Sequence, residues 1–168
     1  VQNVEPLQRL SSINLEDRTT ISRFVLWGMA LDAFKEKPIL GWGQENFIFV
    51  FEKYYDPKMY AQEPWFDRAH NVIFDWLIAG GIFGLLFYLS LFFFALRYTW
   101  KSQNLSVVSK SLFTGLLAAY FFHNLFVFDN IASYLLFIFV LALIHFQLRG
   151  EKELQPKPSS FVYTTAFV

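Results

Sequence analysis

The chain has 168 residues, of which 55% are hydrophobic, 21% aromatic and 17% charged. A soluble domain carries about 25% charged residues, so this composition predicts a membrane protein. The 14 Lys and Arg balance the 14 Asp and Glu, which leaves no basic field for nucleic acid, and the absence of cysteine excludes thiolate metal sites, thiol nucleophiles and disulfides.

Residues 1–71 are predicted to form an extracytoplasmic region of short helices. Apolar residues recur on one side of residues 20–35, which indicates an amphipathic helix, and Pro38 prevents this helix from continuing. After the sequence GWGQENF, residues 45–55 are expected to form a second helix, although the aromatic run FIFVF would also suit a strand by composition. A loop then leads to the first membrane crossing.

Three apolar runs are long enough to cross a bilayer, which takes roughly 20 residues in a helix. They cover about residues 72–97, 111–128 and 131–148. The second and third runs are separated by Asp129 and Asn130 alone, which predicts a tight turn between two membrane helices.

The positive charges predict how these helices are oriented. Lys and Arg are frequent in the link between the first two runs and in the tail, residues 149–168. By the positive-inside rule both segments are cytoplasmic, and residues 1–71 and the short turn lie outside. The predicted fold is therefore all-α: a polytopic membrane protein with an extracytoplasmic helical loop domain, three transmembrane helices and a cytoplasmic tail.

Polar residues gather where the first crossing begins, in the sequence FDRAHNVIFDW. If a helix already runs at Arg68, then Arg68, Asn71 and Asp75 share one face, and Arg68 is the expected partner of Asp75. Ionisable groups at a membrane boundary point to a functional pocket. His123 and Asn124 in the second crossing approach the same leaflet, and we favour interhelical hydrogen bonds as their use.

Glycines recur in the first crossing at Gly80 and Gly84. Small residues four apart let membrane helices approach closely. Helix packing is the favoured interpretation of this pair.

Several short motifs together resemble the bacterial O-antigen ligase superfamily, which includes O-antigen polymerases and pilin O-oligosaccharyltransferases. The matching motifs are His70-Asn71 followed by nine residues, Gly81, two residues and Gly84; Arg23 followed by an apolar residue four positions later; and the turn PILGWG followed by Asn46-Phe47. Trp27 stands where the ligase pattern usually has Leu, which slightly favours the broader superfamily. The resemblance covers roughly residues 18–148, and the start at Val1 fits the C-terminal portion of a longer protein.

The resemblance implies a metal-independent membrane glycosyltransferase without a cofactor, involved in lipopolysaccharide biosynthesis and the cell envelope. Such an enzyme moves a glycan from an undecaprenyl pyrophosphate carrier to an acceptor hydroxyl at the outer face of the bacterial inner membrane, with the active site facing the periplasm or cell exterior. Its partners would be the lipid-linked oligosaccharide donor, a glycolipid or protein acceptor, and membrane lipids.

Roles for individual residues follow from this chemistry. A histidine suits a general base near neutral pH, which makes His70 the catalytic candidate. A leaving pyrophosphate needs cationic and preferably bidentate partners. The expected pyrophosphate ligands are Arg23 and Arg68, with Arg18 as a weaker third, and the expected supporting residues are Asn71 and Asp75.

Two other classes of protein remain as alternatives. A transporter should continue its polar residues toward the cytoplasmic half, but the inner halves of the first two crossings carry only Ser90 and Thr114 among apolar residues. A non-enzymatic membrane module would leave Arg23, Arg68 and His70 unexplained as a set. The residues do not distinguish a ligase from an O-antigen polymerase or a protein O-oligosaccharyltransferase.

Overall fold

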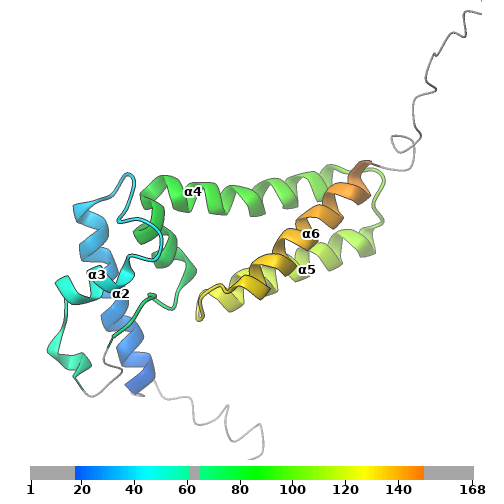
Figure 1. Cartoon of the computed structure of the whole chain (residues 1–168). Coiled ribbons are helices and arrows are strands. Elements are labelled where there is room, and N and C mark those ends of the chain that lie inside the picture. Colours follow the sequence, from blue (N-terminus) through cyan, green and yellow to red (C-terminus); the bar gives the residue numbers. More distant parts are fainter. Residues whose placement is uncertain (1–17, 61–64, 150–168) are drawn as a thin grey trace, which may run out of the picture.

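The computed structural model describes residues 18–60 and 65–149, and every regular element in these two ranges is helical (Figure 1). The elements are α2 (Arg18–Glu36), α3 (Phe47–Lys53), the 3-10 helix η1 (Pro57–Met59), α4 (Val72–Lys101), α5 (Val107–Asn124) and α6 (Ile131–Arg149). The prediction of an all-helical fold is confirmed for this part of the chain, and the FIFVF run is helical. The expectations for residues 1–17 and for the tail beyond Arg149 lie outside the described residues.

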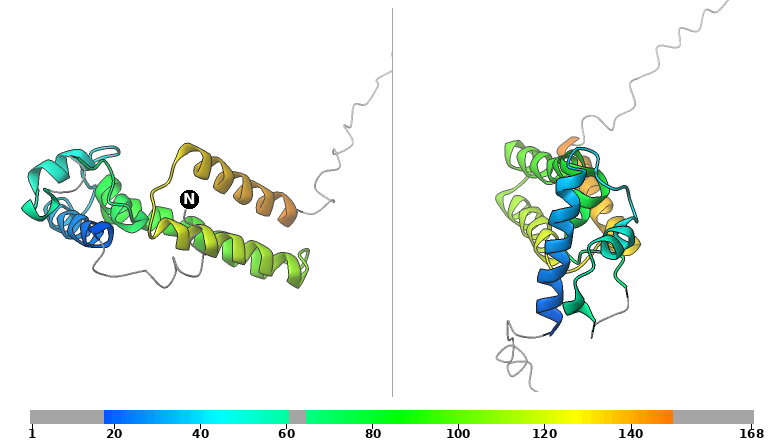
Figure 2. Two further views of the ribbon diagram at one scale, coloured as in Figure 1. Left: turned by 90° about the horizontal axis from the view of Figure 1, so that it is seen from below. Right: turned by 90° about the vertical axis from the view of Figure 1, so that its left-hand side faces the viewer.

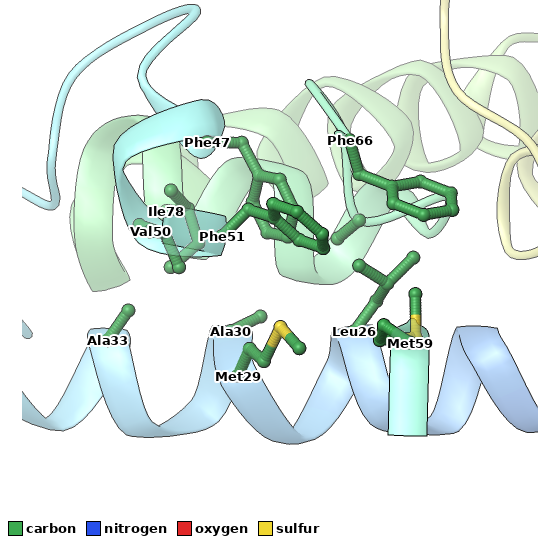
Figure 3. Close-up of a cluster of buried hydrophobic side chains, with 11 residues drawn as sticks. Leu26, Met29, Ala30, Ala33, Phe47, Val50, Phe51, Met59, Phe66 and Ile78 are labelled. Atoms are coloured by element: carbon green, nitrogen blue, oxygen red, sulfur yellow. The ribbon is translucent and has the colours of Figure 1, made fainter. Parts of the chain in front are cut away.

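The helices α2, α3 and η1 form one packed group, which we call the α2–α3 group. Its core takes an apolar stripe of α2, the buried face of α3 and single residues from the following segments (Figure 3). The core residues are Leu26, Met29, Ala30, Ala33, Phe47, Val50, Phe51, Met59, Phe66, Ala69 and Ile78. Because Ile78 belongs to α4, this core joins the group to the start of the first long helix.

The helix α3 is shorter than the predicted segment 45–55. Glu45 has a φ of 61°, which lies outside the helical region, so the helix begins only after Asn46. At the other end, the Tyr54 hydroxyl and the Lys53 ammonium donate to Glu36 Oε2 over 2.7 and 2.6 Å. These bonds join the end of α3 to the end of α2, and they lower the pKa of the Glu36 carboxyl, the bond from Lys53 first.

Two of the described helices, over Val72–Lys101 and Ile131–Leu148, are long and apolar enough to cross a membrane. Only 11% of the Ile131–Leu148 window is buried, so most of its apolar surface is left uncovered by the described chain. The helix α5 extends beside them, away from the α2–α3 group (Figures 1 and 2). A third crossing by α5 stays a prediction.

The helix α4 is broken at Gly81, which has φ 63° and ψ −156°. In a continuous helix the Ile82 amide would donate to the Ile78 carbonyl. Here the Ile82 amide donates to the Pro38 carbonyl over 2.8 Å, and the Ile78 carbonyl accepts from the Trp42 amide over 2.6 Å. The loop of residues 38–42 therefore takes up the hydrogen bonds that the break leaves open, and the two parts of α4 run in different directions (Figure 1).

This arrangement corrects the interpretation of the glycines. An ideal Cβ at Gly80 would have no atom within 4 Å in the described structure, so close helix packing at this position is not observed. At Gly84 the nearest atom is the Trp76 carbonyl oxygen at 3.2 Å, in the first part of the same helix. The residue that the fold requires as glycine is Gly81, because it must adopt a positive φ against the Ile39 carbonyl.

The turn between α5 and α6 is longer than expected. α5 ends at Asn124, so the connection covers residues 125–130 and not Asp129 and Asn130 alone. Asn130 begins α6 with a reciprocal cap: its side chain accepts from the Ser133 amide over 3.0 Å, and the Ser133 hydroxyl accepts from the Asn130 amide over 2.8 Å. These local bonds define where α6 starts.

Candidate functional site

The candidate site is the loop of residues 66–71 together with the first turn of α4. Asn71 is the N-cap of α4, and its side-chain oxygen accepts from the amides of Ile73 over 2.9 Å and Phe74 over 3.4 Å. Asn is a strong N-cap residue because it satisfies amides that lack a helical partner. The helix therefore starts at Val72, and the expectation that Arg68 already lies on a helical face is wrong.

Asn71 also connects this loop to a distant part of the chain. Its side-chain amide donates to the Leu125 carbonyl over 3.0 Å. One buried side chain thus caps α4 and joins the loop to the turn between α5 and α6.

His70 has a left-handed backbone, with a φ of 56°. Its ring meets the rings of Phe66 and Phe128 edge-on, with centroid distances of 5.8 and 5.1 Å. His70 Nδ1 lies 3.2 Å from the Arg68 carbonyl oxygen. Because a carbonyl oxygen can only accept, Nδ1 donates in this bond, and in the neutral ring the lone pair is on Nε2. A backbone carbonyl orients the imidazole, not a carboxylate of Asp67 or Asp75.

Arg68 forms an ion pair with Glu45, between Nη2 and Oε1. The expected pairing with Asp75 is therefore wrong, because the loop that carries Glu45 comes closer to the guanidinium. The Arg68 side chain is 22% exposed and that of Glu45 is 65% exposed, so the pair opens to solvent on the Glu45 side.

Asp75 lies in the first turn of α4 and accepts from the Ala69 amide over 2.8 Å. This bond closes the loop around His70. Asp75 also borders a small hollow of about 10 Å³, room for about one water molecule. The polar groups around this hollow are Gln44, Arg68, Asp75, Asp129 and Tyr134.

Asp129 is a buried carboxylate that borders the same hollow as Asp75. Its Oδ1 accepts from the Tyr120 hydroxyl, from the Asn124 amide over 2.9 Å and from the Ser133 hydroxyl over 3.0 Å. Its Oδ2 has no hydrogen-bond partner among the described residues. The sequence placed polar residues from two crossings at this leaflet, but it did not single out Asp129 as a shared acceptor for side chains of α5 and α6.

The polar pair His123 and Asn124 separates in the structure. Asn124 is buried and bonded to Asp129, whereas His123 is exposed on α5. Asn124 therefore holds the end of α5 to the following turn.

Trp27 connects α2 to the loop. Its indole Nε1 donates to the Ala69 carbonyl over 3.0 Å, and its ring stacks on Phe74 at 5.6 Å. The sequence marked Trp27 only as a departure from the family pattern, and no local pattern around this mid-helix residue indicated its bond to Ala69. Arg23 is one turn earlier on the same face of α2, partly buried and without an ion-pair partner among the described residues.

The structure thus brings together His70, Arg68, Asn71 and Asp75, and it directs the α2 face of Arg23 toward the same loop. Arg18 is the first residue of α2, and its side chain lies outside the described part of the structure. In the two described ranges, no group of three or more His, Asp or Glu residues could hold a metal ion.

Comparison with known proteins agrees with these motifs. No match was found among curated proteins or among solved structures. The profile of a family described as O-antigen ligase matches residues 1–89, which include α2, α3, the His70 loop and the Gly81 break. Because this match covers more than half of the 168 residues, the chain belongs to the O-antigen ligase family.

Proposed function

We propose that this protein transfers a glycan from an undecaprenyl pyrophosphate carrier to an acceptor hydroxyl at the outer face of the bacterial inner membrane. Membership of the O-antigen ligase family supports glycosyl transfer from a lipid-linked donor. The apolar windows over Val72–Lys101 and Ile131–Leu148 support a location in the membrane. The observation that carries the proposal is the His70 ring, whose Nδ1 bond to a carbonyl leaves the Nε2 lone pair available to a substrate.

His70 acts in this proposal as the general base. Nε2 takes the proton of the acceptor hydroxyl while the acceptor oxygen forms a bond to the anomeric carbon of the donor sugar. The bond between that carbon and the pyrophosphate oxygen breaks, and its electron pair leaves with the lipid pyrophosphate. His70 has a positive φ, and for a residue other than glycine this conformation costs of order 1–3 kcal/mol. Such a conformation persists only where the surrounding structure holds it, which is typical of functional positions.

Arg68 and Arg23 bind the pyrophosphate in this proposal, with Arg18 as a weaker third ligand. The Glu45 carboxylate holds the guanidinium of Arg68 until the donor phosphate replaces the carboxylate. The exchange is possible because carboxylate and phosphate oxygens bind the same N–H groups of the planar guanidinium. Arg23 has no ion-pair partner to exchange among the described residues. Asn71 and Asp75 support the site through the α4 cap and the bond to the Ala69 amide.

The proposed topology has residues 1–71 outside, three crossings by α4, α5 and α6, and a cytoplasmic tail. The polar site then faces the periplasm or cell exterior, where the lipid-linked donor is presented. Basic residues in the α4–α5 link and in the tail support this orientation. A transporter or a non-enzymatic membrane module is the alternative, and neither accounts for an imidazole with its Nε2 lone pair available in the loop that also carries Arg68.

The experiment that tests the function uses the full-length protein in membrane vesicles with a radiolabelled lipid-linked oligosaccharide. Label that moves to a glycolipid indicates a ligase, label in longer lipid-linked chains indicates a polymerase, and label in protein indicates an O-oligosaccharyltransferase. A protein with His70→Asn is the control. No transfer of label by the intact protein to any of the three acceptors would contradict the proposal.

A further inference from the structure

The tip of the loop inserted at the α4 break is apolar and exposed. Ile39 is 58% exposed and Leu40 is 75% exposed, although both lie in a loop between two helices of the α2–α3 group. Loops of this kind usually carry polar residues at their tips. Two neighbouring large apolar side chains in this position favour contact with a partner that is itself apolar.

The loop tip lies at the level where the second part of α4 begins. The Pro38 carbonyl accepts from the Ile82 amide, and the Ile39 carbonyl oxygen would lie 2.3 Å from an ideal Cβ at Gly81. Ile82 and Phe83, the first two residues after the break, are themselves exposed. The uncovered apolar surface of α4 therefore starts at the same level as Ile39 and Leu40.

The residues that flank the tip are of the kind found at a membrane surface. The Lys37 ammonium lies 4.0 Å above the ring of Trp42, and the Trp42 indole donates to the Ala33 carbonyl over 2.8 Å. Trp is enriched at membrane interfaces, and Lys extends its ammonium to the headgroups while its alkyl stem stays in apolar surroundings.

The length of α4 after the break matches one membrane thickness. Residues 82–101 at about 1.5 Å each span about 30 Å, which is the thickness of a bilayer hydrocarbon core. Exposed Trp100 and Lys101 stand at the other end, so both ends of this part carry interfacial residues.

We propose that residues 38–41 insert into the lipid leaflet next to the α2–α3 group, beside the break at Gly81, so that the hydrocarbon begins at the level of Ile82. The first part of α4, residues 72–80, and the His70 loop then lie outside the hydrocarbon, at a depth set by this anchor. The partner is the bilayer itself. The inference rests on α4 crossing a membrane and is independent of glycan transfer.

Single cysteines in this cysteine-free chain test the proposal. Leu40→Cys is spin-labelled in the full-length protein and reconstituted into vesicles of phosphatidylethanolamine and phosphatidylglycerol. Collision rates of the label are measured with oxygen, which concentrates in lipid, and with a water-soluble nickel chelate. Tyr60→Cys is the matched control, because Tyr60 is 90% exposed and directly follows η1. The chain segment that contains η1 lies away from the break in α4 (Figure 1).

We expect the ratio of oxygen to nickel collisions to be several-fold higher at position 40 than at position 60. A nickel collision rate at position 40 equal to that at position 60 would place the loop in water and overturn the proposal. Low collision rates with both reagents at position 40 would show that protein covers the tip, which also overturns it. Neither result depends on the transfer assay, so failure here leaves the proposed function standing.

Discussion

Gly41 and Gly81 meet backbone to backbone where the loop of residues 38–42 enters the break in α4. An ideal Cβ at Gly41 would lie 2.6 Å from the Gly81 amide nitrogen, and both residues have positive φ, 69° and 63°. The two glycines belong to segments that are distant in sequence. Because each lacks a Cβ, the backbone of the loop and the backbone of α4 can approach closely at this point.

Gly81→Ala should destabilise the protein more than any other glycine substitution in α4. Gly81 has φ 63° and ψ −156°, a conformation that is essentially restricted to glycine, so alanine there costs of order 1–3 kcal/mol. Its Cβ would also meet the Ile39 carbonyl oxygen at 2.3 Å. Gly80→Ala is the control, because it has open space in the described structure and alanine favours a helix by roughly 0.5–1 kcal/mol. Thermal unfolding in detergent compares the two. Equal melting temperatures would contradict the inserted-loop arrangement.

His70→Asn should abolish transfer without unfolding the protein. Asparagine tolerates positive φ, so the backbone conformation is retained. Its side chain cannot take the proton of the acceptor hydroxyl, and the loss of a general base costs about 100-fold to 10,000-fold in rate. His123→Asn is the matched control, since His123 is exposed on α5. The measurement is transfer from labelled donor at equal protein levels. Transfer by His70→Asn within a factor of a few of the unmodified protein would refute the base assignment.

The roles of Arg68 and Glu45 can be separated, because their substitutions should affect donor use differently. If Arg68 binds pyrophosphate, Arg68→Lys loses the planar guanidinium and lowers kcat/KM for the donor. Glu45→Gln releases the guanidinium from its ion pair and should not lower kcat/KM for the donor. If the pair were only structural, both substitutions would lower the melting temperature and activity together. Donor titrations and thermal unfolding of the two variants decide between these patterns. Arg23→Lys should resemble Arg68→Lys in activity.

Asp129→Ala should lower stability markedly. It removes the acceptor of the Tyr120 hydroxyl and the Asn124 amide, whereas the Ser133 hydroxyl keeps the Asn130 carbonyl as an acceptor. Each buried donor left without a partner costs about 1–3 kcal/mol. Asp67→Ala, at an exposed position in the loop, should change stability by less than about 0.5 kcal/mol. The midpoint of thermal unfolding measures both. A small effect at Asp129 would show that its hydrogen bonds do not hold the 125–130 turn.

Membrane topology is testable with single cysteines at Tyr60 and Asn104, both exposed. In intact cells an impermeant maleimide should label Tyr60→Cys and not Asn104→Cys, and permeabilised cells should label both. The opposite pattern in intact cells would invert the proposed orientation and put the His70 loop in the cytoplasm.

The sequence by itself determined the helices and the family, because both depend on local pattern. Pro38 limits α2, the apolar runs predict the long helices, and the spacing of His70, Gly81 and Gly84 carries the resemblance. Helical periodicity, however, says nothing about where a helix is interrupted when the interrupting partner is far away in the chain.

Tertiary structure decided the geometry of the site. The Ile82 amide bonds to Pro38, Asn71 bonds to Leu125, and Arg68 pairs with Glu45 in place of Asp75. Each of these pairs joins residues that belong to different elements, so no count of residues along one helix face could predict it. The physical reason is that a backbone amide, a capping side chain or a guanidinium bonds to whichever acceptor packing brings within reach, and packing depends on the whole described chain.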